Sequence, residues 1–345
     1  MMADVILSVR DLTVEFQTPD GPKRAVDNIS FDVHEHEVFG VVGESGSGKS
    51  VTMLAVMGLL PQGQARIAGG EVKFRGKSLL DLDTEGLRAI RGKHLSMIFQ
   101  DPMTSLNPVI KIGSQIAEAI GLHQKGLSRS AIRDRAVELL GSVGVPNPGR
   151  RFDQYPHAFS GGMRQRAMIA MAIANDPSIL IADEPTTALD VTIQAQVMEV
   201  LASVRERTGA AMILITHDLG LVAETADRVA VMYGGRVAEL AGVDEIFAEP
   251  RHPYTVGLLA SLPRLDASSS EQLYSIPGQP PGLRGRPSGC VFNPRCGLKR
   301  GRERCETEVP ALREVAPAHA AACHFSEEVG DWVREVAAAK REAAL

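Results

Sequence analysis

Hydrophobic and polar residues alternate along the first part of the chain. Residues 6–16 follow this pattern, and the turn sequence Pro19-Asp20-Gly21-Pro22 comes shortly after them. A period of two is typical of strands with one buried face, so this stretch predicts antiparallel strands separated by the turn. Residues 38–42 form a short apolar run that ends in glycine. We interpret this run as a buried strand that leads into a loop.

Helical spacing of apolar residues begins further along. Residues 49–60 predict a helix that Pro61 ends. Residues 101–158 show helical periodicity at 112–120 and 131–143 and little strand signal, which indicates a mostly helical insertion.

The second half alternates strands with helices. A helix is predicted at residues 163–174, and strands are predicted at 179–182, 213–216 and 229–233. This alternation predicts an α/β fold with a largely parallel sheet and helices on its faces.

The pattern changes again after about residue 250. Residues 277–294 are rich in Pro, Gly and Arg, and residues 327–345 suggest a short alanine-rich helix. A chain of 345 residues exceeds the length that one compact core usually needs. We therefore expect one large domain at residues 1–250, with its helical part at about 101–160, and a small irregular extension at residues 251–345.

Composition narrows the class of protein. The net charge of −5 argues against a dedicated DNA-binding protein, whose phosphate contacts favour a basic balance. The N-terminus has no basic and then apolar leader, and no stretch reaches the length of a membrane span. We expect a cytosolic protein that reaches the membrane only through partners.

A phosphate-binding motif follows the strand at 38–42. The sequence fits G-x-x-x-x-G-K-[ST] at Gly43, Glu44, Ser45, Gly46, Ser47, Gly48, Lys49 and Ser50. Its glycines allow the backbone N–H groups to approach phosphate oxygens, and the helix that follows adds the positive end of its dipole. We expect Lys49 to reach the β- and γ-phosphates of a nucleotide and the Ser50 hydroxyl to hold Mg²⁺.

Two carboxylates follow a second buried strand. Asp183 comes at its end, where it can bind Mg²⁺ through water, and Glu184 follows directly. Glu184 is then placed to orient and deprotonate an attacking water. Taken alone, the pair could be a solvated strand end, but the upstream phosphate motif favours the catalytic interpretation.

A third motif, Phe159-Ser160-Gly161-Gly162-Met163-Arg164-Gln165, offers a hydroxyl and free N–H groups at a helix N-terminus. It resembles the signature motif of ABC-transporter nucleotide-binding domains, although many members have Leu first and Gln fifth. In that family Ser160, Gly161, Gly162 and Gln165 belong to a segment that contacts the γ-phosphate held by a partner subunit in a head-to-tail dimer.

Further matches follow in the order of the family. Gln100 resembles the glutamine that touches Mg²⁺ or water and couples to the membrane subunit, and Ala188-Leu189-Asp190 resembles the loop that acts across the dimer. His217 resembles the histidine that contacts the γ-phosphate and Glu184. Phe16 aligns with the aromatic residue that stacks on adenine. The resemblance covers about residues 6–240 and implies an ATPase with every expected catalytic position filled.

The C-terminal part of the chain resembles one branch of this family. His252-Pro253-Tyr254-Thr255 through Ser261-Leu262-Pro263, and later Gly289 to Cys296, are similar to the extension of oligopeptide, dipeptide and nickel importer ATPases. This branch implies a second, homologous ATPase subunit, two transmembrane permease subunits and an extracytoplasmic solute-binding protein. It places the chain on the cytoplasmic face of the plasma membrane, with the helical insertion as the docking site. Peptides are the favoured cargo, and nickel complexes and other small solutes stay open.

All four cysteines lie in this extension, at Cys290, Cys296, Cys305 and Cys323. Their spacing lacks the close pairs of zinc sites, whereas four thiolates can hold a [4Fe–4S] cluster. Some members of the branch carry such a cluster, so we expect one here. The alternatives are Zn²⁺, four reduced structural cysteines, or two disulfides if the protein is oxidised on handling.

Other functions fit less well. Soluble ABC ATPases of translation usually carry two ATPase domains, and those of DNA repair carry a long coiled coil, neither of which is present. A non-hydrolysing regulatory subunit would usually lack Glu184 or His217. An exporter motor remains possible, but the extension favours import.

Overall fold

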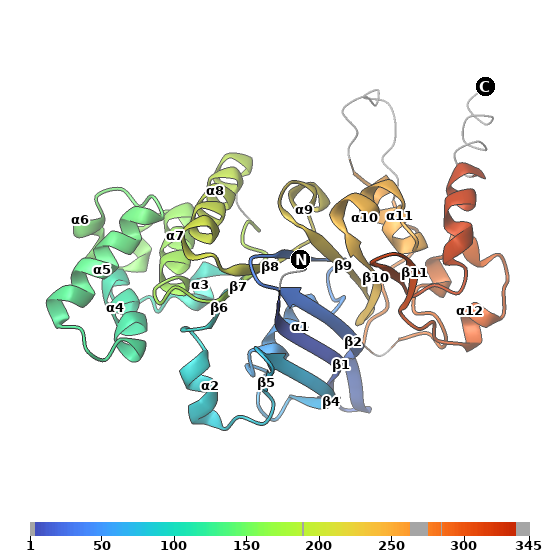
Figure 1. Ribbon diagram of the computed structural model, residues 1–345, viewed down its shortest axis with the longest axis horizontal. Helices are drawn as coiled ribbons and strands as arrows, with labels where there is room; N and C mark the ends of the chain where they lie inside the picture. The colour runs from blue at the N-terminus through green and yellow to red at the C-terminus, as the bar shows by residue number, and fades with distance from the viewer. Residues whose placement is uncertain (1–3, 188–189, 263–274, 284, 336–345) are drawn as a thin grey trace. The chain divides into compact units, whose positions relative to one another are not determined.

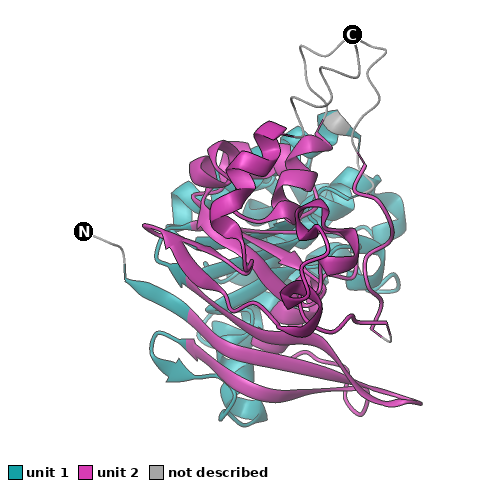
Figure 2. Ribbon diagram, turned by 90° about the vertical axis from the view of Figure 1, so that its right-hand side faces the viewer, with its two compact units in different colours: residues 1–7, 33–37, 74–215 teal, residues 8–32, 38–73, 216–345 magenta. Residues whose placement is uncertain are grey.

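The computed structural model describes residues 4–187, 190–262, 275–283 and 285–335, which fall into two compact units (Figures 1 and 2). Unit 1 comprises residues 1–7, 33–37 and 74–215, and unit 2 comprises residues 8–32, 38–73 and 216–345. The units alternate along the chain, so they follow a different division from the two consecutive domains that the sequence suggests. That domain division stays a prediction.

Unit 1 contains three parallel strands. These are β6 (Leu95–Ile98), β7 (Ile179–Asp183) and β8 (Ala211–Thr216), with Leu95 opposite Ile179 and Ile179 opposite Ala211. All their residues are buried, as expected for parallel strands covered on both faces. The helices α7 (Gly161–Ala172) and α8 (Val191–Thr208) precede β7 and β8 along the chain. The predicted α/β fold with parallel strands is confirmed.

The predicted helical insertion is also present in unit 1. It consists of α3 (Pro102–Ser105), α4 (Ile112–His123), α5 (Arg129–Ser142), α6 (Pro148–Phe152) and the 3₁₀ turn η1 (Pro156–Ala158). Gly113 allows α4 to approach α6, because a Cβ there would lie 2.2 Å from the Phe152 ring. Two elements that the sequence analysis did not predict precede the insertion, β5 (Lys77–Ser78) and α2 (Thr84–Ile90).

The N-terminal strands form a separate sheet. Strand β1 (Val5–Thr18) lies between β2 (Gly21–His34) and β4 (Ala65–Phe74). A two-residue turn joins β1 to β2, which makes them antiparallel, as predicted. Strand β4 was not predicted from the sequence.

The other strands of unit 2 join the C-terminal extension to the strand before the phosphate motif. Strand β3 (Val38–Val42) runs parallel to β9 (Arg228–Tyr233), and β10 (Arg236–Gly242) pairs antiparallel with β9. Strand β12 (His319–Ala321) then pairs with β10, and β11 (Arg313–Ala316) pairs with β12. Along the chain, the helices that follow β8 are α9 (Leu219–Thr225), α10 (Val243–Ala248) and α11 (Pro253–Ala260).

The first helix of unit 2 is shorter than predicted. Helix α1 (Lys49–Val56) ends well before Pro61, which corrects the predicted range of residues 49–60. Gly58 has a φ of 62°, and the N–H of Leu59 donates to the carbonyl of Leu54. A glycine in the left-handed region just after the last turn is a common helix stop, so Gly58 rather than Pro61 ends this helix.

The remaining elements of the extension are short. They are η2 (Asn293–Arg295), η3 (Gly297–Lys299), α12 (Arg304–Thr307) and η4 (Ser326–Glu328). Residues 329–335 are helical, and the rest of the predicted helix at 327–345 lies outside the described residues. Within the described ranges, no helix combines the length and the apolar character that crossing a membrane requires.

Candidate functional site

The phosphate loop, residues 43–50, connects the buried strand β3 to α1 in unit 2. Gly43 has a φ of 151°, and a Cβ there would lie 2.1 Å from the carbonyl oxygen of Met232. Gly48 has a φ of 99°, and its Cβ would lie 2.9 Å from the carbonyl of Ala25. Both positions therefore require glycine, and the close neighbours determine the path of the loop.

Lys49 extends its side chain across this loop. It is 5% exposed, and its Nζ donates to the carbonyls of Gly43 at 2.8 Å and Glu44 at 3.1 Å. Ser50 is half-buried in the first turn of α1. A cation beside a helix N-terminus makes a site for an anion, and a phosphate group fits this chemistry.

The carboxylate pair lies in unit 1. Asp183 ends β7 and is 5% exposed, whereas Glu184 has a φ of 46°. The carboxylate of Glu184 accepts hydrogen bonds from Gln100 Nε2 at 3.1 Å and from Thr187 Oγ1 at 2.8 Å. A left-handed backbone at a glutamate costs about 1–3 kcal/mol, and such strain is concentrated at functional sites. The structure therefore brings Gln100 and Glu184 together and holds Glu184 in a defined orientation.

The glycine-rich third motif begins α7. Ser160 and Gly161 are exposed, and the Ser160 Oγ accepts a hydrogen bond from the N–H of Met163 at 3.3 Å. Gln165 is different, because it is 2% exposed and its Nε2 donates to the carbonyl of Pro185 at 2.8 Å. The helix start thus presents Ser160 and Gly161 to solvent, while Gln165 supports the chain just after Glu184.

Three other predicted residues lie at element ends or on a strand. Asp190 is exposed and caps α8 by accepting from the N–H of Ile193 at 3.0 Å, whereas Ala188 and Leu189 lie outside the described residues. His217 is exposed and directly follows β8. Phe16 is half-buried on β1.

A hollow of about 210 Å³ borders the phosphate loop at Ser45 and Gly46. Its other lining residues come from β2, the β9–β10 turn and the C-terminal extension: Arg24, Ala25, Gly234, Pro280, Pro281, Gly282, Leu283 and Arg286. Phe16 is not among them. The hollow therefore lies between the loop and the C-terminal extension, both in unit 2.

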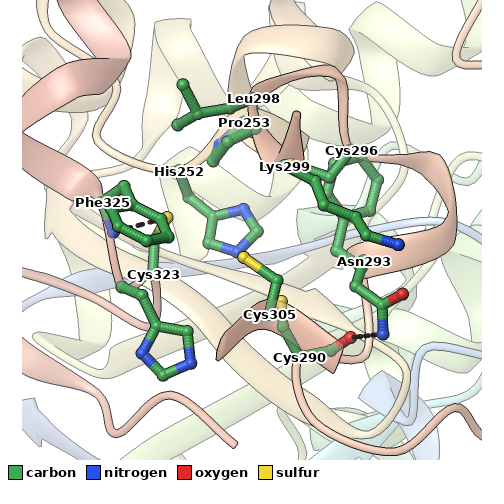
Figure 3. Close-up of a pocket in the computed structure, with 12 residues that line it drawn as sticks. His252, Pro253, Cys290, Asn293, Cys296, Leu298, Lys299, Cys305, Cys323 and Phe325 are labelled. Atoms are coloured by element: carbon green, nitrogen blue, oxygen red, sulfur yellow. Dashed lines mark hydrogen bonds between the residues drawn. The ribbon is translucent and has the colours of Figure 1, made fainter. Parts of the chain in front are cut away.

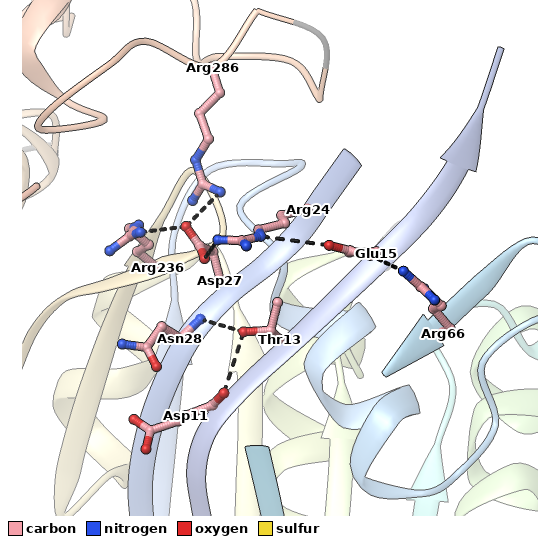
Figure 4. Close-up of polar contacts among 9 residues, drawn as sticks. All are labelled: Asp11, Thr13, Glu15, Arg24, Asp27, Asn28, Arg66, Arg236 and Arg286. Atoms are coloured by element: carbon pink, nitrogen blue, oxygen red, sulfur yellow. Dashed lines mark hydrogen bonds and ion pairs between the residues drawn. The ribbon is translucent and has the colours of Figure 1, made fainter. Parts of the chain in front are cut away.

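A buried carboxylate pairs with the two arginines of this hollow and with a third beside it (Figure 4). Asp27 is 4% exposed and pairs with Arg24 at 3.0 Å, Arg236 at 2.5 Å and Arg286 at 3.0 Å. Burial raises the pKa of Asp27, but the attraction of the three guanidinium groups more than offsets this and keeps the pKa below its ordinary value. Of these residues Arg24 and Arg286 line the hollow itself, so its lining is positively charged.

Two residues that contact the phosphate loop had no role in the sequence analysis. The Tyr254 hydroxyl accepts from the N–H of Glu44 at 2.8 Å, and Arg295 pairs with the Glu44 carboxylate at 2.6 Å. Both had been noted only as part of stretches that mark the importer branch. Because 210 and 251 positions separate them from Glu44, no local pattern could reveal the contacts.

The four cysteines line one pocket, which we call the thiol pocket (Figure 3). All four are free thiols, and His252 and Phe292 also line the pocket. Burial raises the pKa of Cys296 to about 11 and that of Cys323 to about 12, and it also raises the pKa of Cys290 and Cys305. The pocket volume is about 10 Å³, roughly that of a single water site.

The expected metal site is not confirmed by this geometry. Across the ranges that the structure describes, no three or more His, Cys, Asp or Glu side chains are arranged to hold a metal ion. The donor chemistry of four thiols in one pocket nevertheless fits a metal site. Binding of a single ion or of a four-iron cluster would require the thiols to turn toward a common centre.

Comparisons with known proteins agree with these motifs. Residues 26–187 match the ABC transporter family, and residues 238–305 match the oligopeptide/dipeptide transporter C-terminal region. A probable peptide ABC transporter ATP-binding protein of Sinorhizobium fredii, y4tR, is 50% identical, covering 95% of this chain and 97% of the relative. The dipeptide transport ATP-binding protein DppD of Escherichia coli is 50% identical, covering 93% and 96%.

The fold also resembles that of solved proteins. The ATP-binding cassette MJ0796, in a dimeric post-hydrolysis state bound to ADP and Pi, has a TM-score of 0.61 and 28% identity. The similarity covers 69% of this chain and 98% of that structure.

Proposed function

The chain belongs to the family of ABC transporter ATP-binding proteins, in the oligopeptide and dipeptide branch, and from this premise we propose how its residues perform ATP hydrolysis. It is the ATPase motor subunit of a peptide importer and uses ATP with Mg²⁺. The observation that carries the mechanism is the hydrogen bond between Gln100 and Glu184, beside the end of β7.

The phosphate loop provides the binding half of the site. Its N–H groups and the Lys49 ammonium would hold the β- and γ-phosphates, and the Ser50 hydroxyl would be a ligand for Mg²⁺. Asp183 would also be a ligand for Mg²⁺, and Gln100 lies beside Glu184, where it would orient the attacking water. Mg²⁺ supplies charge neutralisation at the phosphates when it is bound.

The catalytic step depends on Glu184. Its carboxylate accepts the proton of the attacking water, and the bonds from Gln100 and Thr187 fix its direction. His217 stabilises the charge on the γ-phosphate. Phe16 stacks on the adenine, and the positive hollow beside Ser45 accommodates the outer part of the nucleotide.

The exposed start of α7 indicates a partner. Ser160, Gly161 and Gly162 complete the site of a second ATPase subunit in a head-to-tail dimer, and Asp190 acts across the same interface. Gln165 has a supporting role, because its buried side chain bonds to Pro185. Within an importer of this branch we propose that the second ATPase is a homologous subunit, so the dimer is a heterodimer.

The helical insertion is the proposed docking site for two transmembrane permease subunits. Met103, Val109, Ile110 and Leu122 are large apolar side chains that are 60%, 78%, 37% and 63% exposed. Exposed apolar residues grouped on one part of a chain are typical of protein interfaces. The subunit would thus be peripheral on the cytoplasmic membrane face, and an extracytoplasmic solute-binding protein would deliver the peptide.

The thiol pocket is the proposed metal site of the extension. Cys290, Cys296, Cys305 and Cys323 would hold a [4Fe–4S] cluster, with Zn²⁺ as the alternative. We propose a structural or regulatory role for it rather than redox catalysis.

Reconstitution tests the proposed function. The chain assembled with its ATPase partner, permeases and binding protein in lipid vesicles should release phosphate from ATP and accumulate peptide. Peptide uptake without ATP consumption, or ATP consumption that no peptide stimulates, would contradict the importer assignment.

A further inference from the structure

The carboxylate of Glu44 is held by the C-terminal extension. Arg295 forms two parallel bonds to it, from Nη1 at 2.6 Å and from Nη2 at 3.0 Å. The Arg295 side chain is only 5% exposed, and it also donates to the Tyr233 hydroxyl and to the carbonyls of Pro277 and Ile276. A guanidinium with so many fixed acceptors has one orientation, so the Glu44 side chain is fixed as well.

The backbone of Glu44 is held from a second direction. Its N–H donates to the hydroxyl of Tyr254, which is fully buried. The N–H of Tyr254 donates to His252 Nδ1 at 3.0 Å, and His252 makes a further hydrogen bond with the backbone of Ala322. Glu44 is therefore bound at both its side chain and its main chain.

Both connections lead to the thiol pocket. Arg295 directly precedes Cys296, and Ala322 directly precedes Cys323. Cys296 and Cys323 belong to one apolar cluster with Leu298, Phe325, Val329 and Trp332. Two separate series of contacts therefore connect this cluster with Glu44.

Glu44 in turn contacts the residue that reaches the phosphates. Its carbonyl accepts a hydrogen bond from Lys49 Nζ at 3.1 Å. Phosphate binding requires the loop N–H groups and this ammonium to be held in position before the ligand arrives. A displacement of Glu44 would move both.

We propose that Arg295 and Tyr254 are positioning residues for the phosphate loop, and that they couple the thiol pocket to nucleotide affinity. The inference rests on the proposed ATPase function. Coupling between two sites is reciprocal, so the nucleotide must also act on the pocket.

Substitutions in the full-length chain test the positioning role. Arg295→Met and Tyr254→Phe should weaken MgATP binding by roughly tenfold, the usual effect of losing a buried bond to a charged or backbone partner. In the assembled transporter KM should rise by a similar factor, with a smaller change in kcat. Arg295→Lys should restore only part of the affinity, because it cannot form the paired bonds.

Arg313→Met is the matched control. Arg313 lies in the same extension, but it is exposed and pairs with Glu327 at 2.7 Å, away from the loop. The Arg313→Met variant should bind MgATP with the affinity of the wild type. Tyr254→Phe removes a single oxygen, so it keeps the test decisive even if Arg295→Met does not fold. A folded Tyr254→Phe with wild-type affinity and KM would overturn the inference, whereas a wild type without ATPase activity would instead contradict the proposed function.

The effect of the nucleotide on the thiol pocket can be followed by tryptophan fluorescence. Trp332 is the only tryptophan of the chain, and it lies against Gly297 in the cluster that contains Cys296 and Cys323. Saturating the isolated chain with MgADP should change its fluorescence in the wild type and in Arg313→Met. The change should be lost in Arg295→Met and Tyr254→Phe at equal saturation. A wild-type fluorescence that MgADP leaves unchanged would overturn the coupling.

Discussion

The side-chain amide of Gln100 donates a hydrogen bond to the carboxylate of Glu184 at 3.1 Å, across 84 positions of the chain. Gln100 follows β6 and Glu184 follows β7, and these two strands are parallel neighbours. The carboxyl ends of adjacent parallel strands meet at one edge of a sheet, where ligands bind in such folds. The contact therefore joins the residue proposed to couple to the membrane subunits with the proposed catalytic base.

Replacing this base should stop hydrolysis. Glu184→Gln retains the size and the hydrogen-bonding position of the side chain but cannot accept the proton of water. We expect turnover in the assembled transporter to fall by roughly 10²–10⁴-fold, the usual contribution of a general base, while MgATP binding persists. Phosphate release and equilibrium binding of radiolabelled ATP would be measured together. Glu199→Gln, on α8, is a control that should leave both unchanged, and normal hydrolysis by Glu184→Gln would refute the base assignment.

The cluster around Asp27 should stabilise the fold in a manner that depends on pH. Asp27→Asn removes the charge that balances Arg24, Arg236 and Arg286, so it should lower the free energy of unfolding by about 1–3 kcal/mol at pH 7. The folded pKa of Asp27 is depressed, so its stabilisation is present above the unfolded pKa of about 3.9 and is lost as pH falls through the folded value. Urea unfolding from pH 7 to pH 3 would measure this.

An exposed carboxylate provides the comparison for that experiment. Asp153 pairs with Arg133 at 2.8 Å on the surface, where solvent screens the pair. Asp153→Asn should change stability less than Asp27→Asn at every pH. An equal effect of the two substitutions would show that burial of Asp27 contributes nothing.

Two glycines with similar φ angles allow the cost of a left-handed backbone to be distinguished from the cost of a steric clash. Gly235 has a φ of 79° and Gly63 a φ of 75°. A Cβ at Gly235 would lie 2.4 Å from the carbonyl of Ala25, whereas nothing lies within 4 Å at Gly63. Gly63→Ala should cost about 1–2 kcal/mol from the backbone alone. Gly235→Ala should cost about 1–3 kcal/mol more and should also weaken ATP binding, because the N–H of Gly235 donates to Ser47 in the phosphate loop.

Thermal unfolding and ATP binding of these two alanine variants would be measured in parallel. Equal melting temperatures would show that the turn at Gly235 shifts without cost. Unchanged ATP affinity in Gly235→Ala would show that this turn does not support the loop.

Metal analysis of the anaerobically purified chain examines the thiol pocket. We expect about four iron and four acid-labile sulfide per chain, with a broad absorbance near 400 nm. One zinc per chain would instead identify a single-ion site, and no metal at all would contradict both forms of the proposal.

The parts of the site that the sequence could predict are local in the chain. The phosphate loop follows from glycines and a lysine at fixed spacing, because a backbone that surrounds phosphate needs residues that accept positive φ. Gln100 and Glu184 could be paired in advance only through the resemblance, since nothing in their own neighbourhoods relates them. The predicted end of α1 was wrong because proline is a strong helix-ending signal in a sequence, whereas in the structure the left-handed Gly58 ends the helix before Pro61 is reached.

The other unpredicted features depend on long-range packing. Strands β11 and β12 are only 4 and 3 residues long, and β10 carries the charged Glu239, so their sequences lack a clear alternation. Glu239 is fully buried because His319 of β12 and the N–H groups of Arg251 and His252 satisfy it. From the sequence alone, such a residue is predicted to lie on the surface, because the partners that allow its burial are distant in the chain.

The pairing of β12 with β10 also has a consequence for how this protein can be shortened. Ala321 lies opposite Glu239, and the N–H of Ala322 donates to the carbonyl of Ala238, so the extension covers one side of β10. A fragment that stops near residue 262 would leave the peptide groups along that side without partners and would leave Glu239 without His319. Uncovered strand edges recruit strands from other molecules, so such a fragment should self-associate even if every nucleotide-binding residue is intact.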